Sequence, residues 1–242
     1  MISLDPGLLV VSLLVVTVAA AVQGSMGLGF GQIAAAGLVW TLPDMMPAIV
    51  ILMACLVGAA SAFRERHNIN LPNLQRSLYG RMAGTALAIP LIVVAAQYPQ
   101  GFPLLFGTLL LVAVVISLTP YRPRMSGAVL ITAGTASGLM GTITAVGAPP
   151  MGLVYQDQDI KMARPTLNAF FAIGGVVSIM ALWYSGRFSL QHVVMLLYLS
   201  PALVAGLFIS GKIRKYSGNQ FRYFVLAFST ISALMLIAKT IQ

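Results

Sequence analysis

Two glycine-rich runs hold the residues whose types and spacing could do chemistry in this chain. The first, GSMGLGFG, extends from Gly24 to Gly31 and places four glycines among eight residues. Glycine permits positive φ angles and a close approach of the backbone to a ligand. We expect a helix to begin just after this run, at about Gln32, and the first turn of a helix presents unpaired N–H groups and a partial positive charge. The run therefore predicts an anion-binding site.

The second run, GTITAVGAPP, extends from Gly141 to Pro150 and adds a different set of groups. Its proline pair, Pro149 and Pro150, suits the first turn of a short helix, where a missing N–H leaves no bond unmade. Thr142 and Thr144 add hydroxyl donors within the break. We expect the half-helix ends that follow the two runs to converge near the middle of the membrane.

A simpler interpretation is that the glycines only let helices pack closely, as small residues do in membranes. Recurrence of the pattern, together with the proline pair, favours a binding site. The spacing GxGxG also occurs in nucleotide-binding loops, but those need a preceding strand and a following acidic residue. Neither is present here, so that interpretation is excluded.

Two arginines could supply positive charge to such a site. Arg81 lies inside an apolar run, and arginine at membrane depth is costly unless it is used. It either counters an anion or snorkels to the boundary beside Arg76. Arg164 is either a boundary charge or part of the inner mouth of a pathway. Thr166 and Asn168, at the start of a helix, either cap and pair between helices or bind substrate.

The predicted substrate-binding residues come from both runs and from these polar positions. They are Gly24, Ser25, Gly27, Gly29, Gly31, Gln32, Arg81, Gly141, Thr142, Thr144, Gly147, Pro149, Pro150, Arg164, Thr166 and Asn168. We expect no cofactor and no metal site, because Cys55 is the one cysteine and the thirteen methionines are explained by packing.

The acidic residues narrow the class of transported solute. All five lie in expected loops or at helix ends: Asp5, Asp44, Glu65, Asp157 and Asp159. No carboxylate is then left at mid-membrane to relay protons or sodium ions, which disfavours a cation transporter. An anion needs no such relay for export, because an inside-negative potential drives each negative charge outward by about 2.3 kcal/mol per 100 mV.

An intramembrane serine hydrolase is the main enzymatic alternative, with Ser25 as nucleophile and His192 as base. These side chains must meet within hydrogen-bond reach. Ser25 is expected deep in a hairpin and His192 near the outer end of a helix, so we do not expect an enzyme. A passive anion channel and a purely structural subunit stay open as alternatives.

The elements that position these residues are membrane helices. Of the 242 residues 59% are apolar and 8% are charged, whereas soluble domains carry about 25% charged residues. One crossing needs about 20 apolar residues, so the chain has room for roughly eight. The net charge of +9 is spread singly or in pairs between apolar runs, which indicates membrane topology and a lipid partner, not nucleic acid.

Six charge-poor runs are predicted to be transmembrane helices: residues 45–63, 82–96, 102–119, 166–184, 189–209 and 223–238. Two more apolar regions, 8–42 and 126–156, are broken by the glycine-rich runs, and each is predicted to form two partial helices. The pieces 31–42 and 148–156 would reach about half way across a core of about 30 Å. We therefore expect re-entrant hairpins whose breaks are enclosed by protein.

The order of these elements repeats. Gly24 to Gly27 recurs as Gly138 to Gly141, and the segment from Ile69 to Tyr79 recurs as the segment from Phe188 to Tyr198, with offsets drifting from 114 to 119. We predict one all-α polytopic membrane domain of two homologous halves, 1–119 and 120–242. Each half is a broken hairpin followed by three helices.

The distribution of basic loops favours halves of inverted topology. If each broken segment returns to the side from which it entered, the basic loops all face the cytoplasm and both chain ends face outward. A plain eight-crossing arrangement with parallel halves is the alternative, and it would place basic loops on both sides.

These motifs resemble those of the sulfite exporter TauE/SafE family, also classed as four-toluene sulfonate uptake permeases. The resemblance is carried by GSMGLGFG with the following Leu42-Pro43, and by GLMGTITAVGAPPMGLVY with the following segment from Ala163 to Thr166. It implies a permease of the bacterial inner membrane that moves a small anion, with the breaks near the substrate. Sulfite or a related sulfur-containing or sulfonate anion is the implied substrate and export the implied direction. Monomer and homodimer both stay open.

Overall fold

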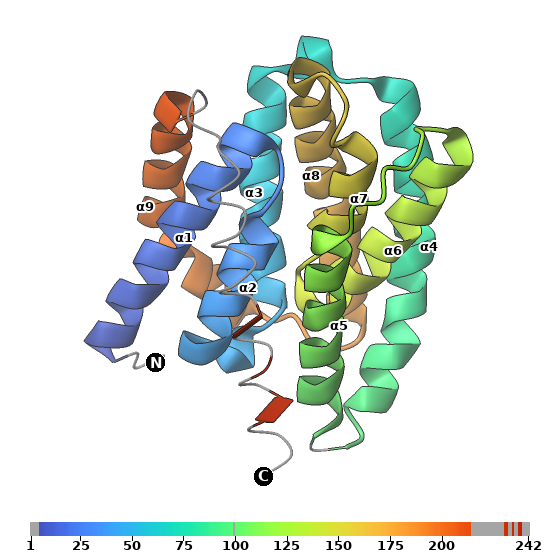
Figure 1. Ribbon diagram of the computed structural model, residues 1–242. Helices are drawn as coiled ribbons and strands as arrows, with labels where there is room; N and C mark the ends of the chain where they lie inside the picture. Colours follow the sequence, from blue (N-terminus) through green and yellow to red (C-terminus); the bar gives the residue numbers. More distant parts are fainter. Residues whose placement is uncertain (1–4, 99, 214–229, 232–233, 235–236, 239–242) are drawn as a thin grey trace.

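The computed structural model describes residues 5–98, 100–213, 230, 231, 234, 237 and 238 (Figure 1). This part of the chain is built from helices, with no strand among the described residues. The α-helices are α1 (Pro6–Met26), α2 (Phe30–Thr41), α3 (Ala48–Arg64), α4 (Leu71–Ala95), α5 (Gly101–Leu118), α6 (Gly127–Thr144), α7 (Ala148–Tyr155), α8 (Ile160–Tyr184) and α9 (Leu190–Ile213). Short 3₁₀ turns, η1 (Pro43–Met45) and η2 (Arg66–Asn68), flank α3. The prediction of an all-α membrane fold is confirmed.

The first broken hairpin is α1 followed by α2. The Asp5 carboxylate accepts from the Gly7 N–H at 2.7 Å and so caps the start of α1. The helix ends where Gly27 adopts a φ of +86°, a left-handed conformation that glycine tolerates best. Gly29, at φ +106°, then turns the chain into α2. The break between α1 and α2 is therefore set by two glycines that adopt positive φ angles.

The second broken hairpin is α6 followed by α7. Ala145 ends α6 at a φ of +64°, and the Thr144 hydroxyl accepts from the Val146 N–H at 3.0 Å within the turn. Helix α7 begins at Ala148, so Pro149 and Pro150 occupy its first turn. The predicted position of the proline pair is confirmed.

The two hairpins open toward opposite ends of the molecule. In Figure 1, α1 rises from the end where the N-terminus lies and α2 turns back toward it, whereas α6 starts from the other end and α7 turns back there. The returning arms hold 12 and 8 residues, so they are about 18 and 12 Å long. Each stops part of the way across a bilayer core of about 30 Å.

The first helix of each broken hairpin, α1 or α6, is longer than the sequence-based expectation. Helices α1 and α6 have 21 and 18 residues and are both long and apolar enough to span a membrane. The prediction of two partial helices around each break is therefore wrong for these arms. The reason is that the glycines before each break stay helical, and the chain leaves the helix only at the left-handed positions.

Three helix pairs form the packed body of the described structure: α4 with α6, α1 with α9 and α3 with α8. In the first pair, Gly80 and Gly84 on α4 face the Ile131 and Thr135 carbonyls of α6, so closely that a Cβ would overlap them. Gly134 on α6 faces the Ser77 carbonyl of α4 in the same way. These glycines serve close packing, the simpler role considered for glycine above.

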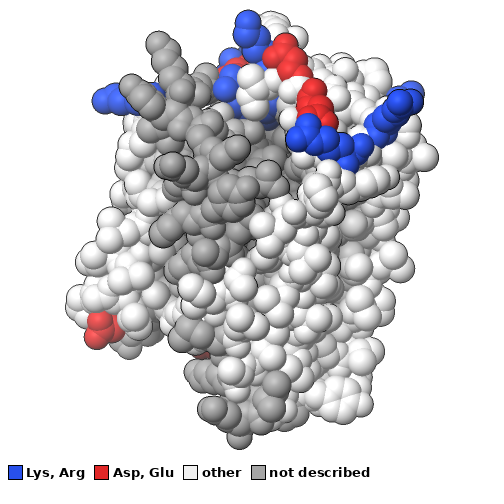
Figure 2. Space-filling view, in the orientation of Figure 1, with Lys and Arg blue, Asp and Glu red and all other residues white. Residues whose placement is uncertain are grey.

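Six described helices are long and apolar enough to span a membrane, namely α1, α4, α5, α6, α8 and α9, and α3 is a shorter apolar helix. Charged side chains gather at one end, where α3, α7 and α9 finish and α4, α6 and α8 start (Figures 1 and 2). By the positive-inside rule, we expect this end to face the cytoplasm. The predicted helix at 223–238 lies largely outside the described residues.

The helix order is compatible with two inverted halves. The breaks correspond when Gly27 is matched to Ala145 and Gly29 to Gly147, an offset of 118 in both cases. An offset of 118 is close to the offset of 119 between the segments that start at Ile69 and Phe188. The offset of 114 between the Gly24–Gly27 run and the Gly138–Gly141 run agrees with it less well. Only the first GxMG run reaches a break, since Gly138 to Gly141 lies inside α6.

Candidate functional site

The centre of the candidate site is the buried guanidinium of Arg81. This residue is only 3% exposed, and ten residues separate it from the start of α4, which places it about 15 Å along the helix and near mid-membrane. Arg81 therefore does not snorkel to the boundary. No carboxylate lies within ion-pair distance of it among the described residues.

Hydroxyl and carbonyl groups from α6 and α8 surround this guanidinium. One terminal nitrogen donates to the Ser137 carbonyl at 3.2 Å and to the Ser137 hydroxyl at 3.1 Å. The other donates to the Ser178 hydroxyl at 3.3 Å. The Nε–H has no hydrogen-bond partner in the described structure. Because its hydrogen-bond partners are neutral, the guanidinium keeps its positive charge uncancelled. Its unused Nε–H donor can also bind an anion.

The hydroxyls continue beyond the guanidinium as a connected chain. Ser178 lies 2.9 Å from the Thr142 hydroxyl, which lies 3.2 Å from the hydroxyl of Thr85. Ser137 also donates to the Gly147 carbonyl at 2.6 Å and so links Arg81 to the break before α7. Serine and threonine hydroxyls can both donate and accept. These hydroxyl groups can therefore rotate their hydrogens toward a bound anion.

Two glycines, which have no side chain, leave the space that the guanidinium occupies. A Cβ on Gly174 would overlap the Arg81 Nε, and one on Gly141 would lie 3.1 Å from a terminal nitrogen. On the remaining side, the rings of Phe170 and Phe171 have their centroids 5.3 and 6.0 Å from the guanidinium carbon. Cation–π contacts stabilise a buried cation without neutralising it.

The two breaks touch one another beside this cluster. A Cβ on Gly31 would overlap the Ala145 carbonyl, so the start of α2 packs directly on the turn between α6 and α7. The predicted convergence of the two runs therefore occurs as backbone contact. Gly147, predicted to bind substrate, is the residue just before α7, and a Cβ on it would lie 3.0 Å from a terminal nitrogen of Arg81.

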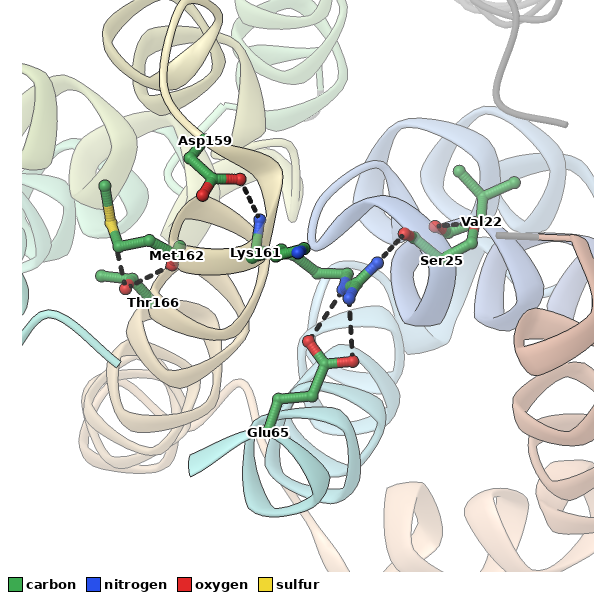
Figure 3. Close-up of polar contacts among 8 residues, drawn as sticks. Val22, Ser25, Glu65, Asp159, Lys161, Met162 and Thr166 are labelled. Carbon is green, nitrogen blue, oxygen red and sulfur yellow. Dashed lines mark hydrogen bonds and ion pairs between the residues drawn. The ribbon is translucent and has the colours of Figure 1, made fainter. Parts of the chain in front are cut away.

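A second polar cluster lies at the basic end, around Arg164 of α8. Its guanidinium donates from Nε and from one terminal nitrogen to the two Glu65 carboxylate oxygens, both at 2.9 Å. The remaining terminal nitrogen lies 3.4 Å from the Ser25 carbonyl of α1. Figure 3 shows Glu65 on one side of this bridge and Ser25 on the other. A Cβ on Gly27 would lie 2.8 Å from the Arg164 backbone, so the tip of the first hairpin rests on α8.

Asn168 and Thr166 lie on the same helix as this arginine. Asn168 is 1% exposed, and neither its side-chain oxygen nor its nitrogen has a hydrogen-bond partner in the described structure. An unpaired buried amide costs roughly 1–3 kcal/mol, so it calls for a functional explanation. Thr166 instead donates to the Met162 carbonyl at 2.7 Å and accepts from the Asn70 N–H at 3.0 Å, which is the structural role considered for it.

Several predicted residues lie away from the central guanidinium. Gly24 faces Ser210 of α9, where a Cβ would be 2.6 Å from the hydroxyl oxygen. The Gln32 amide donates to the Ser117 hydroxyl of α5 at 3.3 Å. Ser25 donates to the Val22 carbonyl at 2.9 Å (Figure 3), and Thr144 donates to the Met140 carbonyl at 2.8 Å. A role for these residues in binding stays a prediction.

Ser137 and Ser178 were not predicted from the sequence. Each lies inside an apolar helix without a local pattern, so a serine there is indistinguishable from one that bonds to its own helix. A weak signal exists: Ser137 is next to Gly138, Ser178 is four residues after Gly174, and both glycines pack against α4. Burial of both at 0% exposure is a property of the tertiary structure.

The hydrolase arrangement does not form in the described structure. The Ser25 hydroxyl donates to a carbonyl of its own helix, and the Nδ1 of His192 accepts from the Ser189 N–H at 3.1 Å. His192 is also buried, at 7% exposure, and stacks on the ring of Phe188. The loop before α9 packs against the His192 ring, close to the start of α9 where the sequence placed this residue. No group of three or more metal-ligating His, Cys, Asp or Glu residues occurs among the described residues.

These features define a class. A bundle of helices long and apolar enough to span a membrane, with two broken hairpins that meet beside a buried arginine, is the architecture of a membrane transporter. The chain matches the sulfite exporter TauE/SafE family over residues 12–236, and it belongs to that family. It is thus a multi-pass protein of the bacterial inner membrane and a transporter of sulfur-containing anions such as sulfite. No curated protein and no solved structure matches it.

Proposed function

We propose that this protein exports sulfite, or a related sulfur-containing anion, and that the substrate binds at Arg81 between the two broken hairpins. The observation that carries the proposal is the guanidinium itself. It is almost fully buried, no carboxylate among the described residues pairs with it, and its Nε–H has no partner. A charge is costly to bury in a membrane and is retained where it is used.

The groups around Arg81 suit a small oxyanion. Sulfite has three oxygens on one pyramidal sulfur, and guanidinium offers a rigid fork of donors that matches two oxygens of such an anion. The hydroxyls of Ser137, Ser178 and Thr142 can supply further donors. Gly141 and Gly147 keep the backbone close to the guanidinium. A larger anion such as a sulfonate would need its apolar group to lie against the nearby phenylalanine rings.

The proposed direction follows from charge. An inside-negative potential favours outward movement of an anion by about 2.3 kcal/mol per negative charge and 100 mV. The basic end of the molecule would draw anions to the cytoplasmic mouth. Neither effect needs a coupling ion.

We further propose that residues 1–119 and 120–242 are inverted repeats that rock against each other around the contact between the two breaks. Support comes from the hairpins opening to opposite ends (Figure 1). Support also comes from the pairing of α1 with α9 and of α6 with α4, because a two-fold axis in the membrane plane would exchange these pairs.

The test is transport by the purified protein in liposomes, with a counterflow screen over sulfite, thiosulfate, methanesulfonate and acetate. We expect saturable exchange of sulfite. Arg81→Gln should abolish it while the protein still folds, because glutamine keeps hydrogen-bonding groups and removes the charge. Normal sulfite exchange by this variant would refute the site, and flux that does not saturate would favour an anion channel.

A further inference from the structure

The pair formed by Arg164 and Glu65 has the geometry of an occupied anion site. Two nitrogens of the guanidinium each meet one carboxylate oxygen at 2.9 Å, the fork arrangement in which arginine binds carboxylates and other oxyanions. Both side chains are 14% exposed, so the pair is sheltered and yet within reach of solutes at the basic end. A sulfur oxyanion could present two oxygens to the same fork.

This pair also fastens three separate parts of the chain. Glu65 lies just after α3, Arg164 belongs to α8, and the third contact of the guanidinium is the Ser25 carbonyl at the end of α1. Carbonyls in the last turn of a helix lack partners within the helix and carry partial negative charge. The arginine therefore holds the tip of the first broken hairpin, next to the tight contact of Gly27 with α8.

We propose that the Glu65 carboxylate stands in for the substrate at the cytoplasmic mouth, and that an entering sulfur oxyanion displaces it from Arg164 and thereby releases the hairpin tip. This inference rests on the proposed function and adds an entry site to it, distinct from the central site at Arg81. The displaced carboxylate would no longer tie α3 to α8 and α1. Entry of an anion and opening of the mouth would then be one event.

A second ion pair at the same end provides a matched control. Arg122 and Asp157 are joined at 2.7 Å, but their side chains are 68% and 51% exposed. This pair links the loop before α6 to the loop after α7, and neither side chain forms a hydrogen bond to α1 in the described structure. Exposed pairs of this kind contribute little to stability or binding. Asp157→Asn therefore removes one carboxylate at the cytoplasmic end without touching the proposed mouth.

The experiment measures uptake of ³⁵S-sulfite into inside-out membrane vesicles under anaerobic conditions, so that the cytoplasmic face receives the anion. Glu65→Gln should lower the KM for sulfite by about tenfold, because loss of an internal competitor worth about 1.4 kcal/mol has that effect. Asp157→Asn should leave the KM unchanged. Arg164→Lys keeps the charge but lacks the fork, so it should raise the KM and cancel the gain of Glu65→Gln in the double variant.

The outcomes separate this inference from the proposed function. An unchanged or higher KM for Glu65→Gln overturns the entry site, even if Arg81→Gln abolishes transport. If Glu65→Gln does not fold, Glu65→Asp is tested instead, and its shorter side chain should give a smaller decrease of the KM, whereas no decrease overturns the proposal. If Arg81→Gln transports normally, the central site fails while the comparison of Glu65→Gln with Asp157→Asn still decides the entry site.

A binding measurement provides a readout that does not need transport. In the transport-deficient Arg81→Gln background, added sulfite should raise the Tm of the solubilised Glu65→Gln double variant. It should have a smaller effect on Arg81→Gln alone, in which the carboxylate still competes. Equal shifts in the two proteins would overturn the displacement of Glu65.

Discussion

Gly174→Ala is a precise probe of the central site because it moves Arg81 without changing any charge. Gly174 lies on α8, and a Cβ at this position would overlap the Nε and approach the Cδ of Arg81. The guanidinium is held by Ser137 on α6 and Ser178 on the same helix as the glycine. It cannot retreat from the new methyl group and keep both contacts.

The magnitude follows from these contacts. Inserting a methyl group into a packed site costs about 1–3 kcal/mol, of which roughly 0.5–1 kcal/mol is offset because alanine stabilises a helix relative to glycine. The folded protein should therefore lose about 1–2 kcal/mol. A displaced guanidinium should also lose one charge-assisted hydrogen bond to the anion, worth about 1.5–3 kcal/mol. The KM for sulfite should then rise about 10- to 100-fold.

The assay combines two measurements on the same purified protein. Sulfite exchange in liposomes gives the KM, and thermal unfolding followed by the fluorescence of Trp40 and Trp183 gives the loss of stability. Gly211→Ala is the control, because it also replaces glycine within a described helix, α9, and its Cβ would meet no atom of the described residues within 4 Å. A folded Gly174→Ala protein whose KM equals that of Gly211→Ala would refute the reasoning that places the anion on Arg81.

Three further predictions concern other parts of the molecule. Ser178→Ala removes the hydroxyl between the guanidinium and Thr142, so the KM for sulfite should rise about tenfold, as measured by counterflow. Asn168→Leu replaces an unpaired buried amide with an apolar side chain of the same branching, so thermal unfolding should show a gain of about 1 kcal/mol while transport falls if the amide binds substrate. A gain in stability with normal transport would remove this residue from the site. In a Cys55→Ala background, the variants Asp44→Cys and Gly186→Cys should react with membrane-impermeant thiol reagents only from outside the cell. Labelling from the cytoplasmic side would contradict the inverted topology.

Much of the architecture could be predicted from local sequence. The shortage of charged residues required a membrane fold, and the proline pair marked the start of α7 to the residue. These features depend on hydropathy, dihedral angles and missing N–H groups, all of which act within a few residues. The lengths of α1 and α6 were harder to predict, because glycine in a helix is tolerated where a neighbouring helix packs on it.

The candidate site could be predicted only in part. Both glycine-rich runs and Arg81 stood out, because glycine clusters and membrane-embedded charges are unusual in any sequence. Ser137 and Ser178 did not, since their contacts with Arg81 join positions 56 and 97 residues away. The pairing of Arg164 with Glu65 spans 99 residues and could not be predicted either, because a basic and an acidic residue near helix ends have many possible partners.

The sequence by itself determined that this protein lies in the membrane, that two apolar segments break, and that one arginine enters an apolar helix. Only the tertiary structure decided what surrounds that arginine. The rotation of α4 against α6 and α8 turns Arg81 inward, toward hydroxyls and away from lipid, and no described carboxylate meets it there. Whether a buried charge is neutralised or left available depends on side chains from distant segments, and their arrangement is fixed by packing of the whole bundle.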